Sequence, residues 1–520
     1  MPPPRSQNAI ALPRVDRWHP SNLVLHPSGC RSTGLLPHFD DNRAVWYATA
    51  PGTNRRFSGD SAAIISGRVT AQSGVEGSAM IALLTVGVIL VAYAAISAPL
   101  DRRGITSAMA FVVVGFVAGA HGLGLLDVAL ESTVAERVTE LALVFLLFSD
   151  AARLDLQALR QDLVWPSRLL LVGLPLTMII GFGAGLLVFP GLGLASAFLL
   201  STMLCSTDAA LGQRVVDDPA VPDRVRQALD VESGLNDGLA VPFFLVAMDI
   251  SMATLVGGVP SAVISNAAQQ IGWGLVAGVV AGAGGGAVFR LSAGKGWLQI
   301  QWRQIFTCAI ALTAYAIAGS LGGSGFIGAF VAGMAFGLTS REHGLGVTYL
   351  TQQAGSILAA VTWMGFGALA ISHVFPDITW RVVLYATLSL TVVRMVPVAV
   401  ALAGTGARWP TVTFMGWFGP RGLASVVFGL LALERGVPEA HTLLATVVVT
   451  VGMSVFLHGL TSLPFVARYH DWYARQNATA SAGAEGKPTR VSRGRYQHGS
   501  DEMGTTDVPS PAADDARPDE

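Results

Sequence analysis

The chain has 520 residues, of which 52% are hydrophobic and 13% are charged, and its formal net charge is −1. Soluble globular proteins carry about 25% charged residues, so this composition excludes a nucleic-acid-binding protein with a basic surface, a disordered chain and an acidic buffer protein. A chain rich in apolar and small residues is typical of a polytopic membrane protein, and we expect an all-α fold.

The first 79 residues differ from the rest. They contain eight Arg, five acidic residues and eight Pro, and they have neither helical nor strand periodicity. We therefore predict a disordered N-terminal extension over residues 1–79. It lacks the apolar stretch of a secretory signal peptide. Since the first apolar run begins directly at Met80, we also hypothesise that translation starts at or near Met80 and that the extension is an artefact of start-site assignment.

Residues 80–467 are predicted to form a transmembrane domain, because about thirteen apolar segments there are long enough to span a bilayer. The loops between the segments are short, so they cannot house a soluble catalytic domain. The polar tail over residues 468–520 is predicted to be disordered. The segments are 80–98, 107–126, 134–150, 168–189, 193–213, 226–249, 261–290, 304–321, 324–339, 348–374, 380–404, 411–433 and 440–466.

The distribution of Lys and Arg among the loops predicts the orientation of the chain. If the N-terminus lies outside, the inside loops carry thirteen of these residues and the outside loops carry three. We therefore expect an external N-terminus, a cytoplasmic C-terminus and a location in the plasma (inner) membrane.

The fifth segment carries Ser206-Thr207-Asp208 after about thirteen apolar residues. An ionisable side chain inside a span is costly, so it is a functional candidate by default. Two interpretations of Asp208 remain open, a helix N-cap or interfacial residue and an ion ligand. A second carboxylate on the next segment favours the ligand.

That next segment reads Glu232-Ser-Gly-Leu-Asn-Asp237. Ser233 and Asp237 are four residues apart and share one helix face, and Glu232 and Asn236 form the adjoining row. Oxygen donors of this kind suit a hard cation that must lose its water. Simple helix-packing hydrogen bonds are the alternative.

The eleventh and twelfth segments carry two arginines at membrane depth. Arg394 would be costly alone, and we interpret it as the structural partner of Glu232. Arg421 lies in Gly419-Pro-Arg-Gly422, which interrupts a helix, and it could neutralise helix ends or pair with a carboxylate. His458, in the last segment, is interpreted as a packed or interfacial residue.

The fifth and twelfth segments are seven spans apart and therefore run in opposite directions. Interrupted helices in such positions are typical of inverted-repeat transporters. The sequence contains no G-x-x-x-x-G-K-[ST] motif, which disfavours an ATP-driven pump.

Four stretches together resemble the monovalent cation/proton antiporter family of the NhaP and sodium/proton exchanger type. They are Leu146–Leu156, Ser206–Ala210, Val231–Pro242 and Phe418–Ser425. The resemblance implies an antiporter fold of thirteen helices, with inverted repeats and interrupted crossing helices, and a homodimer in which a mobile core moves against a dimerisation domain.

The resemblance also implies the site. Asp208 and Asp237 would bind the cation or the proton, with Ser233, Thr207 and Asn236 nearby. The Asn-Asp pair resembles the electroneutral branch of the family. Glu232 resembles a glutamate of the family that pairs with an arginine on the eleventh helix. Arg394 matches that arginine. Asp150 falls near an acidic position of the third helix, although it could equally lie at the cytoplasmic helix end.

We therefore expect a secondary active antiporter that exchanges Na⁺, or else K⁺ or Li⁺, for H⁺. The proton and the cation compete, because protonation removes the charge that attracts the cation. We expect no enzymatic activity, no cofactor, no resident metal and no nucleic-acid or nucleotide partner. A cation channel and an intramembrane aspartic hydrolase are the alternatives.

The start-site hypothesis is tested by mass spectrometry of the purified protein. We expect peptides that begin at or near Met80, and peptides from before Met80 would contradict the hypothesis.

Overall fold

The computed structural model describes residues 35–40, 43–48, 59–120, 122–126, 133–154, 163–256, 260–340, 345–370, 374–479 and 484–486. The chain divides into two compact units, Met1–Val75 and Glu76–Glu520.

The first unit contains a two-stranded antiparallel sheet. Strand β1 (Leu35–Asp40) pairs with β2 (Arg43–Ala48), and Leu35 lies opposite Ala48. Val, Trp and Tyr follow one another in β2, and such residues favour strands. Helix α1 (Gly59–Arg102) also begins before Met80. The sheet and the part of α1 up to residue 79 lie within the predicted disordered extension, and its disorder stays a prediction.

The described part of the second unit contains no named strand, which confirms the predicted all-α membrane fold. Each of the thirteen predicted segments overlaps a helix or an interrupted helix. Six described helices are long and apolar enough to cross a membrane by length and composition, so the count of thirteen stays a prediction. Helix α19 continues to Thr479, beyond the predicted end of the transmembrane domain.

The helices of this unit, in chain order after α1, are α2 (Ser107–Ala118), α3 (Thr133–Ala152), α5 (Val164–Arg168), η1 (Leu169–Gly173), α6 (Leu174–Val188), α7 (Leu194–Met203), α8 (Ala209–Asp217), α9 (Asp223–Val256), α10 (Pro260–Gly294), α11 (Ile300–Ser320), α12 (Gly325–Ser340), α13 (Leu345–Gly365), η2 (Phe366–Ala370), η3 (Phe375–Asp377), α15 (Trp380–Leu390), α16 (Val392–Leu402), α17 (Trp409–Trp417), α18 (Leu423–Glu434), α19 (Ala440–Thr479) and η4 (Ala484–Gly486).

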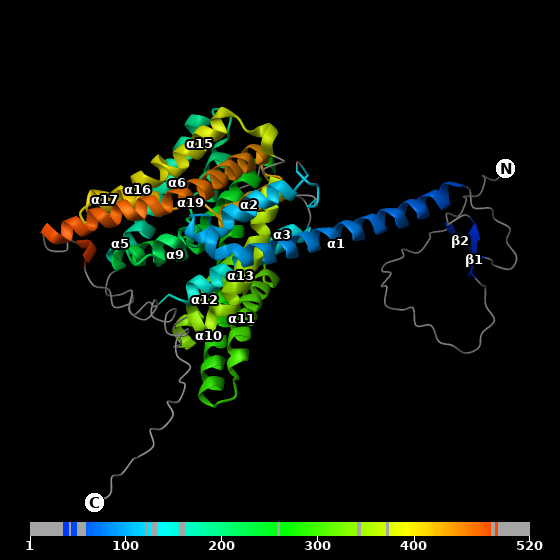
Figure 1. The fold of residues 1–520 in the computed structure, drawn as a ribbon, viewed down its shortest axis with the longest axis horizontal. Coiled ribbons are helices and arrows are strands. Elements are labelled where there is room, and N and C mark those ends of the chain that lie inside the picture. Colours follow the sequence, from blue (N-terminus) through cyan, green and yellow to red (C-terminus); the bar gives the residue numbers. More distant parts are fainter. Residues whose placement is uncertain are drawn as a thin grey trace, which may run out of the picture. The chain divides into compact units, whose positions relative to one another are not determined.

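The helices pack as two groups (Figure 1). The first helix group consists of α2, α3 and α10 to α13, in which α12 packs against α3, α10 and α11. The second helix group consists of α5 to α9 and α15 to α19. Within the second group, α7–α8 and α17–α18 are both interrupted in the middle, as the inverted-repeat prediction requires.

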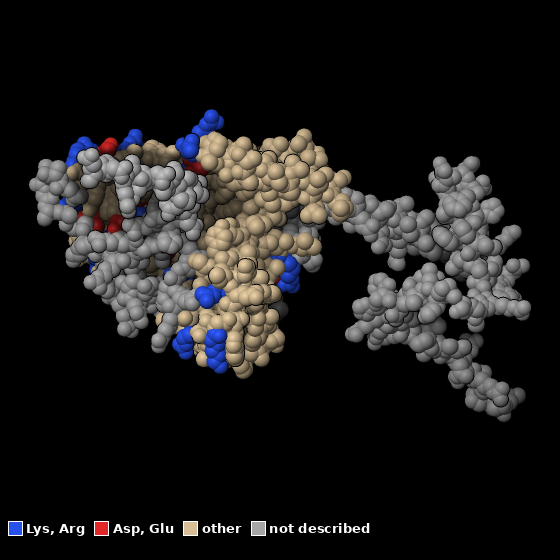
Figure 2. All heavy atoms as spheres, turned by 60° about the horizontal axis from the view of Figure 1, so that its bottom comes forward, with Lys and Arg blue, Asp and Glu red and all other residues tan. Residues whose placement is uncertain are grey.

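The surface of the second unit is largely apolar, as expected for a protein that contacts lipid. Many large hydrophobic side chains are exposed, for example Leu171, Leu187 and Ile300. Figure 2 shows a broad uncharged surface on which Lys and Arg stand in small groups. Such exposure is unfavourable in water but suits the hydrocarbon core of a bilayer. The chain is thus a multi-pass membrane protein.

Glycines allow α10 and α12 to pack backbone against backbone. A Cβ atom on Gly282 would lie 2.3 Å from the carbonyl oxygen of Ala332, whereas a Cβ atom on Gly284 would meet nothing within 4 Å. Small residues commonly permit such close approach between membrane helices. The two glycines therefore differ in what they contribute, although they lie on the same helix.

This difference gives a matched pair of variants. We expect Gly282→Ala to lower the thermal unfolding temperature, because overpacking costs about 1–3 kcal/mol, and Gly284→Ala to leave it unchanged or slightly higher, because Ala favours helix over Gly. Fluorescence-detected size-exclusion chromatography after heating measures both. Equal behaviour of the two variants would contradict the close packing.

Candidate functional site

The two interrupted helices cross at their extended segments, residues 204–208 and 418–422. The backbone N–H of Asp208 donates to the carbonyl oxygen of Pro420 at 2.9 Å. A Cβ atom on Gly422 would lie 1.9 Å from Oδ2 of Asp208, so a larger residue does not fit there. The crossing therefore depends on the Gly419-Pro-Arg-Gly422 sequence, from which the interruption of the helix is predicted.

Asp208 lies where two half-helices begin. Its Oδ1 accepts from the backbone N–H groups of Ala210 and Leu211, at 2.8 and 3.1 Å, which makes it the N-cap of α8. Its Oδ2 accepts from the N–H of Leu423 at 2.8 Å, at the start of α18. A carboxylate at helix N-termini is stabilised by the free N–H groups and the helix dipoles. The N-cap interpretation is thus correct, and the same carboxylate also lies at the crossing.

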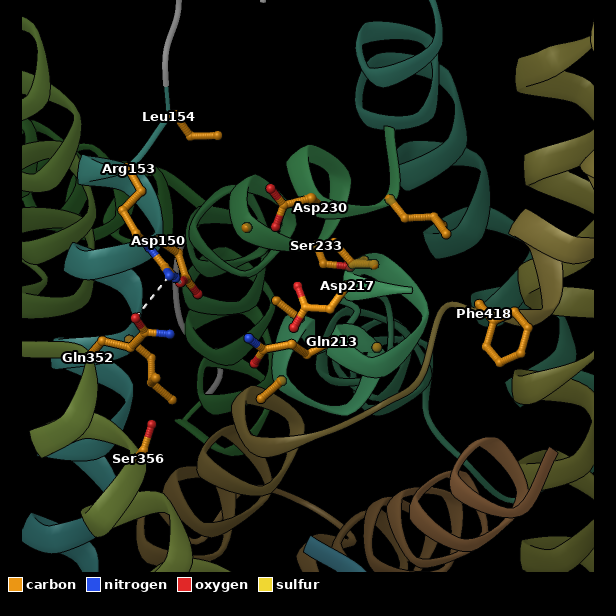
Figure 3. Close-up of a pocket in the computed structure, with 17 residues that line it drawn as sticks. Asp150, Arg153, Leu154, Gln213, Asp217, Asp230, Ser233, Gln352, Ser356 and Phe418 are labelled. Carbon is orange, nitrogen blue, oxygen red and sulfur yellow. Dashed lines mark hydrogen bonds and ion pairs between the residues drawn. The ribbon is translucent and has the colours of Figure 1, made fainter. Parts of the chain in front are cut away.

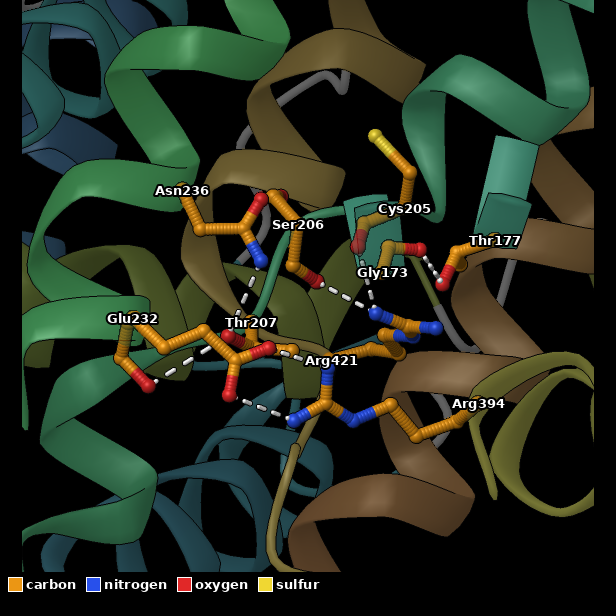
Figure 4. Close-up of polar contacts among 10 residues, drawn as sticks. Gly173, Thr177, Cys205, Ser206, Thr207, Glu232, Asn236, Arg394 and Arg421 are labelled. Carbon is orange, nitrogen blue, oxygen red and sulfur yellow. Dashed lines mark hydrogen bonds and ion pairs between the residues drawn. The ribbon is translucent and has the colours of Figure 1, made fainter. Parts of the chain in front are cut away.

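Arg421 binds backbone carbonyl groups at the C-terminal end of α7. Its side chain is completely buried, and Nη1 donates to the carbonyl oxygens of Cys205 and Ser206, at 2.8 and 2.9 Å (Figure 4). These carbonyls follow the last turn of α7, where the helix dipole is negative. Of the two roles that the sequence leaves open, the structure places Arg421 at a helix end.

Glu232 and Arg394 form a buried ion pair in which both guanidinium Nη atoms contact the carboxylate (Figure 4). The distance from Nη2 to Oε2 is 2.9 Å, and the two side chains are 2% and 4% exposed. A Cβ atom on Gly419 would lie 2.1 Å from Nε of Arg394, so Gly419 makes room for the arginine. Each charge is compensated by the other.

Three polar side chains, Thr207, Ser233 and Asn236, contact one another beside the crossing. The hydroxyl oxygens of Thr207 and Ser233 are 3.3 Å apart, and Nδ2 of Asn236 donates to Oγ1 of Thr207 at 3.2 Å. Asp237 lies close enough to Asp208 and Asp150 for their charges to interact with it.

Two oxygens at this place have no hydrogen-bond partner. Oδ1 of Asp237 and Oδ1 of Asn236 are buried and unpartnered within the described part of the chain. Buried acceptors are normally satisfied, so these two oxygens are candidate ligands for a cation. Among the described residues, no three His, Cys, Asp or Glu side chains are grouped so that they could hold a metal ion.

A cavity of about 500 Å³ leads to Ser233 from between the two helix groups. Residues of α3 and α13 line one side, and residues of α8 and α9 line the other (Figure 3). Asp150, in the last turn of α3, lines this cavity and pairs with Arg153, which also donates to Gln352 at 3.0 Å. Asp150 is thus both near the site and at a helix end.

Two further carboxylates of the cavity, Asp217 and Asp230, are not among the predicted site residues. Asp230 precedes Ser233 by three residues and Asp237 by seven, so helical spacing places all three on one face. That pattern could have revealed it. Asp217 ends α8 and reads as an ordinary loop charge.

Comparison with known proteins identifies the family. Residues 83–468 match the model of the transmembrane sodium/hydrogen exchanger. The chain belongs to the sodium/hydrogen exchanger family. It is 26% identical over 392 residues to the K⁺/H⁺ antiporter NhaP of Alkalimonas amylolytica, which covers 74% of this chain and 66% of that protein. It is 25% identical over 345 residues to the Na⁺/H⁺ antiporter ApNhaP of Aphanothece halophytica, with 63% of each chain covered.

A solved structure shows the same fold. The sodium proton antiporter MjNhaP1 of Methanocaldococcus jannaschii matches with a TM-score of 0.57 and 17% identity, over 73% of this chain and 99% of that chain. The family resemblance on which the sequence analysis relied is thus confirmed. The chain spans just under two thirds of the length of the first of these antiporters.

The buried ion pair predicts a specific pattern of stability. We expect Arg394→Ala to reduce the yield of folded protein, because an uncompensated buried charge costs about 3–5 kcal/mol, and to leave the cation preference of the remaining protein unchanged. The double variant Glu232→Leu with Arg394→Met should recover most of the yield, since no lone charge remains. Normal yield with an altered cation preference in Arg394→Ala would contradict a structural role. Size-exclusion chromatography and transport in vesicles measure the two quantities.

Proposed function

We propose that this protein is a secondary active antiporter that exchanges a monovalent cation for H⁺. The observation that carries the proposal is the unpartnered, buried Oδ1 of Asp237 beside Asp208 and Asp150. The family and the printed activities of its relatives, K⁺/H⁺ and Na⁺/H⁺ antiport, support it. Na⁺ is the expected cation, with K⁺ and Li⁺ as alternatives.

Asp208 and Asp237 have different roles at the proposed site. Asp208 keeps three backbone N–H bonds, so its carboxylate lies fixed at the crossing. Asp237 has an oxygen without a hydrogen-bond partner among the described residues and supplies the exchangeable position. Ser233, Thr207 and Asn236, which are joined by hydrogen bonds, are the further proposed ligands. A proton on Asp237 removes the charge that a cation needs. Binding of one ion therefore excludes the other, and no ATP is required.

The division into two helix groups supports a mechanism of alternating access. The predicted ligands Thr207, Asp208, Ser233 and Asp237 all belong to the second helix group, so they can move as one body. The cavity between the groups gives Ser233 access from the side of α8 and the start of α9, which the predicted orientation makes the cytoplasm. Gly238 lies against the ring of Phe330 on α12, where any Cβ would clash, so α9 has a close contact with the first group.

The remaining expectations belong to this proposal. Asn236 next to Asp237 favours electroneutral exchange, since the neighbouring position carries no second carboxylate. We place the protein in the plasma membrane as a homodimer, with the N-terminus outside and the C-terminus in the cytoplasm, where it would contribute to pH homeostasis. Asp150 is proposed as an accessory residue at the mouth of the site.

Isosteric amides test the site. We expect Asp237→Asn and Asp208→Asn each to reduce cation-driven proton movement in everted vesicles to the level of vesicles without the protein. Asn is a good N-cap, so Asp208→Asn keeps the start of α8. Asp249→Asn is the matched control, because Asp249 lies on α9 but its carboxylate contacts Gln270 at 3.1 Å; this variant should exchange at nearly the wild-type rate.

The assay uses Na⁺, K⁺ and Li⁺ in turn, with the membrane potential clamped and unclamped. Full exchange by Asp237→Asn would remove the proposed site. Cation flux without proton movement would indicate a channel instead, and a rate that follows the membrane potential would contradict electroneutral exchange. Cleavage of membrane peptides would favour an aspartic hydrolase.

A further inference from the structure

Three helix ends at the crossing are compensated by groups already described: the starts of α8 and α18 by Asp208, and the end of α7 by Arg421. The end of α17 is the remaining one. Its last carbonyl, that of Trp417, accepts from the backbone N–H of Gly419 at 2.8 Å. It also lies 2.9 Å from Nε2 of His458 on α19.

His458 also connects to the other side of the break. The backbone N–H of Arg421 donates to Oγ of Ser454 at 2.7 Å, and this Oγ lies 3.2 Å from Nδ1 of His458. His458 is 3% exposed and Ser454 is fully buried. One turn of α19 therefore holds the extended segment at both ends, at Trp417 and at Arg421.

Both ring nitrogens lie 2.9 Å from a carbonyl oxygen, Nε2 from that of Trp417 and Nδ1 from that of Ser454. A neutral ring can donate to only one of them. We assign the hydrogen to Nε2, because Nδ1 can then accept from the hydroxyl of Ser454 while Nε2 donates to Trp417. Nδ1 accepts from the hydroxyl of Ser454 in the neutral ring, or donates to the carbonyl of Ser454, 2.9 Å away, in the charged ring. Both forms share the bond to Trp417, so the role of His458 depends on a donor and not on titration.

The extended segment 418–422, which His458 contacts, also contacts Asp208 together with the first residue of α18. Pro420 accepts from the N–H of Asp208, and Leu423 donates to its carboxylate. A segment released at Trp417 would let both contacts shift, because they lie three and six residues further along the chain. The geometry of Asp208 is thus linked to an N–H on a different helix.

We propose that His458 is a positioning residue of the ion site, which fixes the crossing segment and with it the Asp208 carboxylate by donating Nε2–H to the carbonyl oxygen of Trp417. This inference rests on the proposed function for its transport readout. Its structural readout is independent of transport.

Two substitutions at one position separate the donor from the bulk of the side chain. Leu at 458 fills the space without a donor, whereas Gln supplies an N–H that can reach a carbonyl and cannot titrate. Thr450→Val is the matched control, because Thr450 is buried on the same helix but its hydroxyl donates to Thr446 of α19 itself.

The first measurement is hydrogen–deuterium exchange of the purified full-length protein, read by mass spectrometry over residues 417–423. We expect faster exchange in His458→Leu than in the wild type, and wild-type exchange in His458→Gln and Thr450→Val. Unchanged exchange in His458→Leu would overturn the inference, whether or not the protein transports ions. Faster exchange in a protein that moves no ions would uphold the inference and refute the proposed function.

The second measurement is exchange in everted vesicles with Na⁺ and with K⁺, corrected for the amount of folded protein. We expect His458→Leu to raise the apparent KM for the cation about tenfold, the size expected when one buried acceptor loses its donor, with the maximal rate largely kept. His458→Gln should restore the KM and keep the wild-type pH profile. A KM in His458→Gln equal to that in His458→Leu, or a flattened pH profile, would contradict the donor role.

Discussion

Four half-helix ends meet inside the protein where α7–α8 and α17–α18 cross, and each end needs a partner because unpaired backbone N–H and C=O groups are costly at membrane depth. Asp208 meets the two positive ends, Arg421 meets the carbonyls after α7, and His458 meets the carbonyl of Trp417. The polar residues of the crossing are therefore first of all what allows two helices to be broken in the middle of a membrane protein.

This requirement explains why charge is concentrated in one place in a chain with so few charges. The carboxylate of Asp208 accepts from three backbone N–H groups, and Glu232 and Arg394 neutralise each other. Asp237 differs because one of its oxygens has no partner among the described residues. We therefore propose Asp237, whose Oδ1 has no hydrogen-bond partner among the described residues, as the exchangeable position. The neighbouring Asp208 is held in place by backbone N–H groups.

Much of this arrangement could be predicted from local sequence. The spacing of Ser233 and Asp237, and the cost of a lone Arg394, follow from helical periodicity and from the low dielectric of the membrane. The contact of Asp208 with Leu423 could not be predicted in the same way, because the two residues are 215 positions apart. His458 likewise reads as a packed residue until the fold brings the carbonyl of Trp417, 41 positions away, into contact with it.

The short half-helices also have a consequence for how the protein is made. Helix α7 has ten residues, about 15 Å at 1.5 Å per residue, which is about half the hydrocarbon thickness of a bilayer. The ribosome delivers this segment roughly two hundred residues before α17 and α18, whose backbone completes its environment. Until then Asp208 lacks the N–H of Leu423, and the end of α7 lacks Arg421. The nascent chain therefore has to keep this span shielded, by the insertion machinery or by its neighbouring helices, until most of the protein has been synthesised.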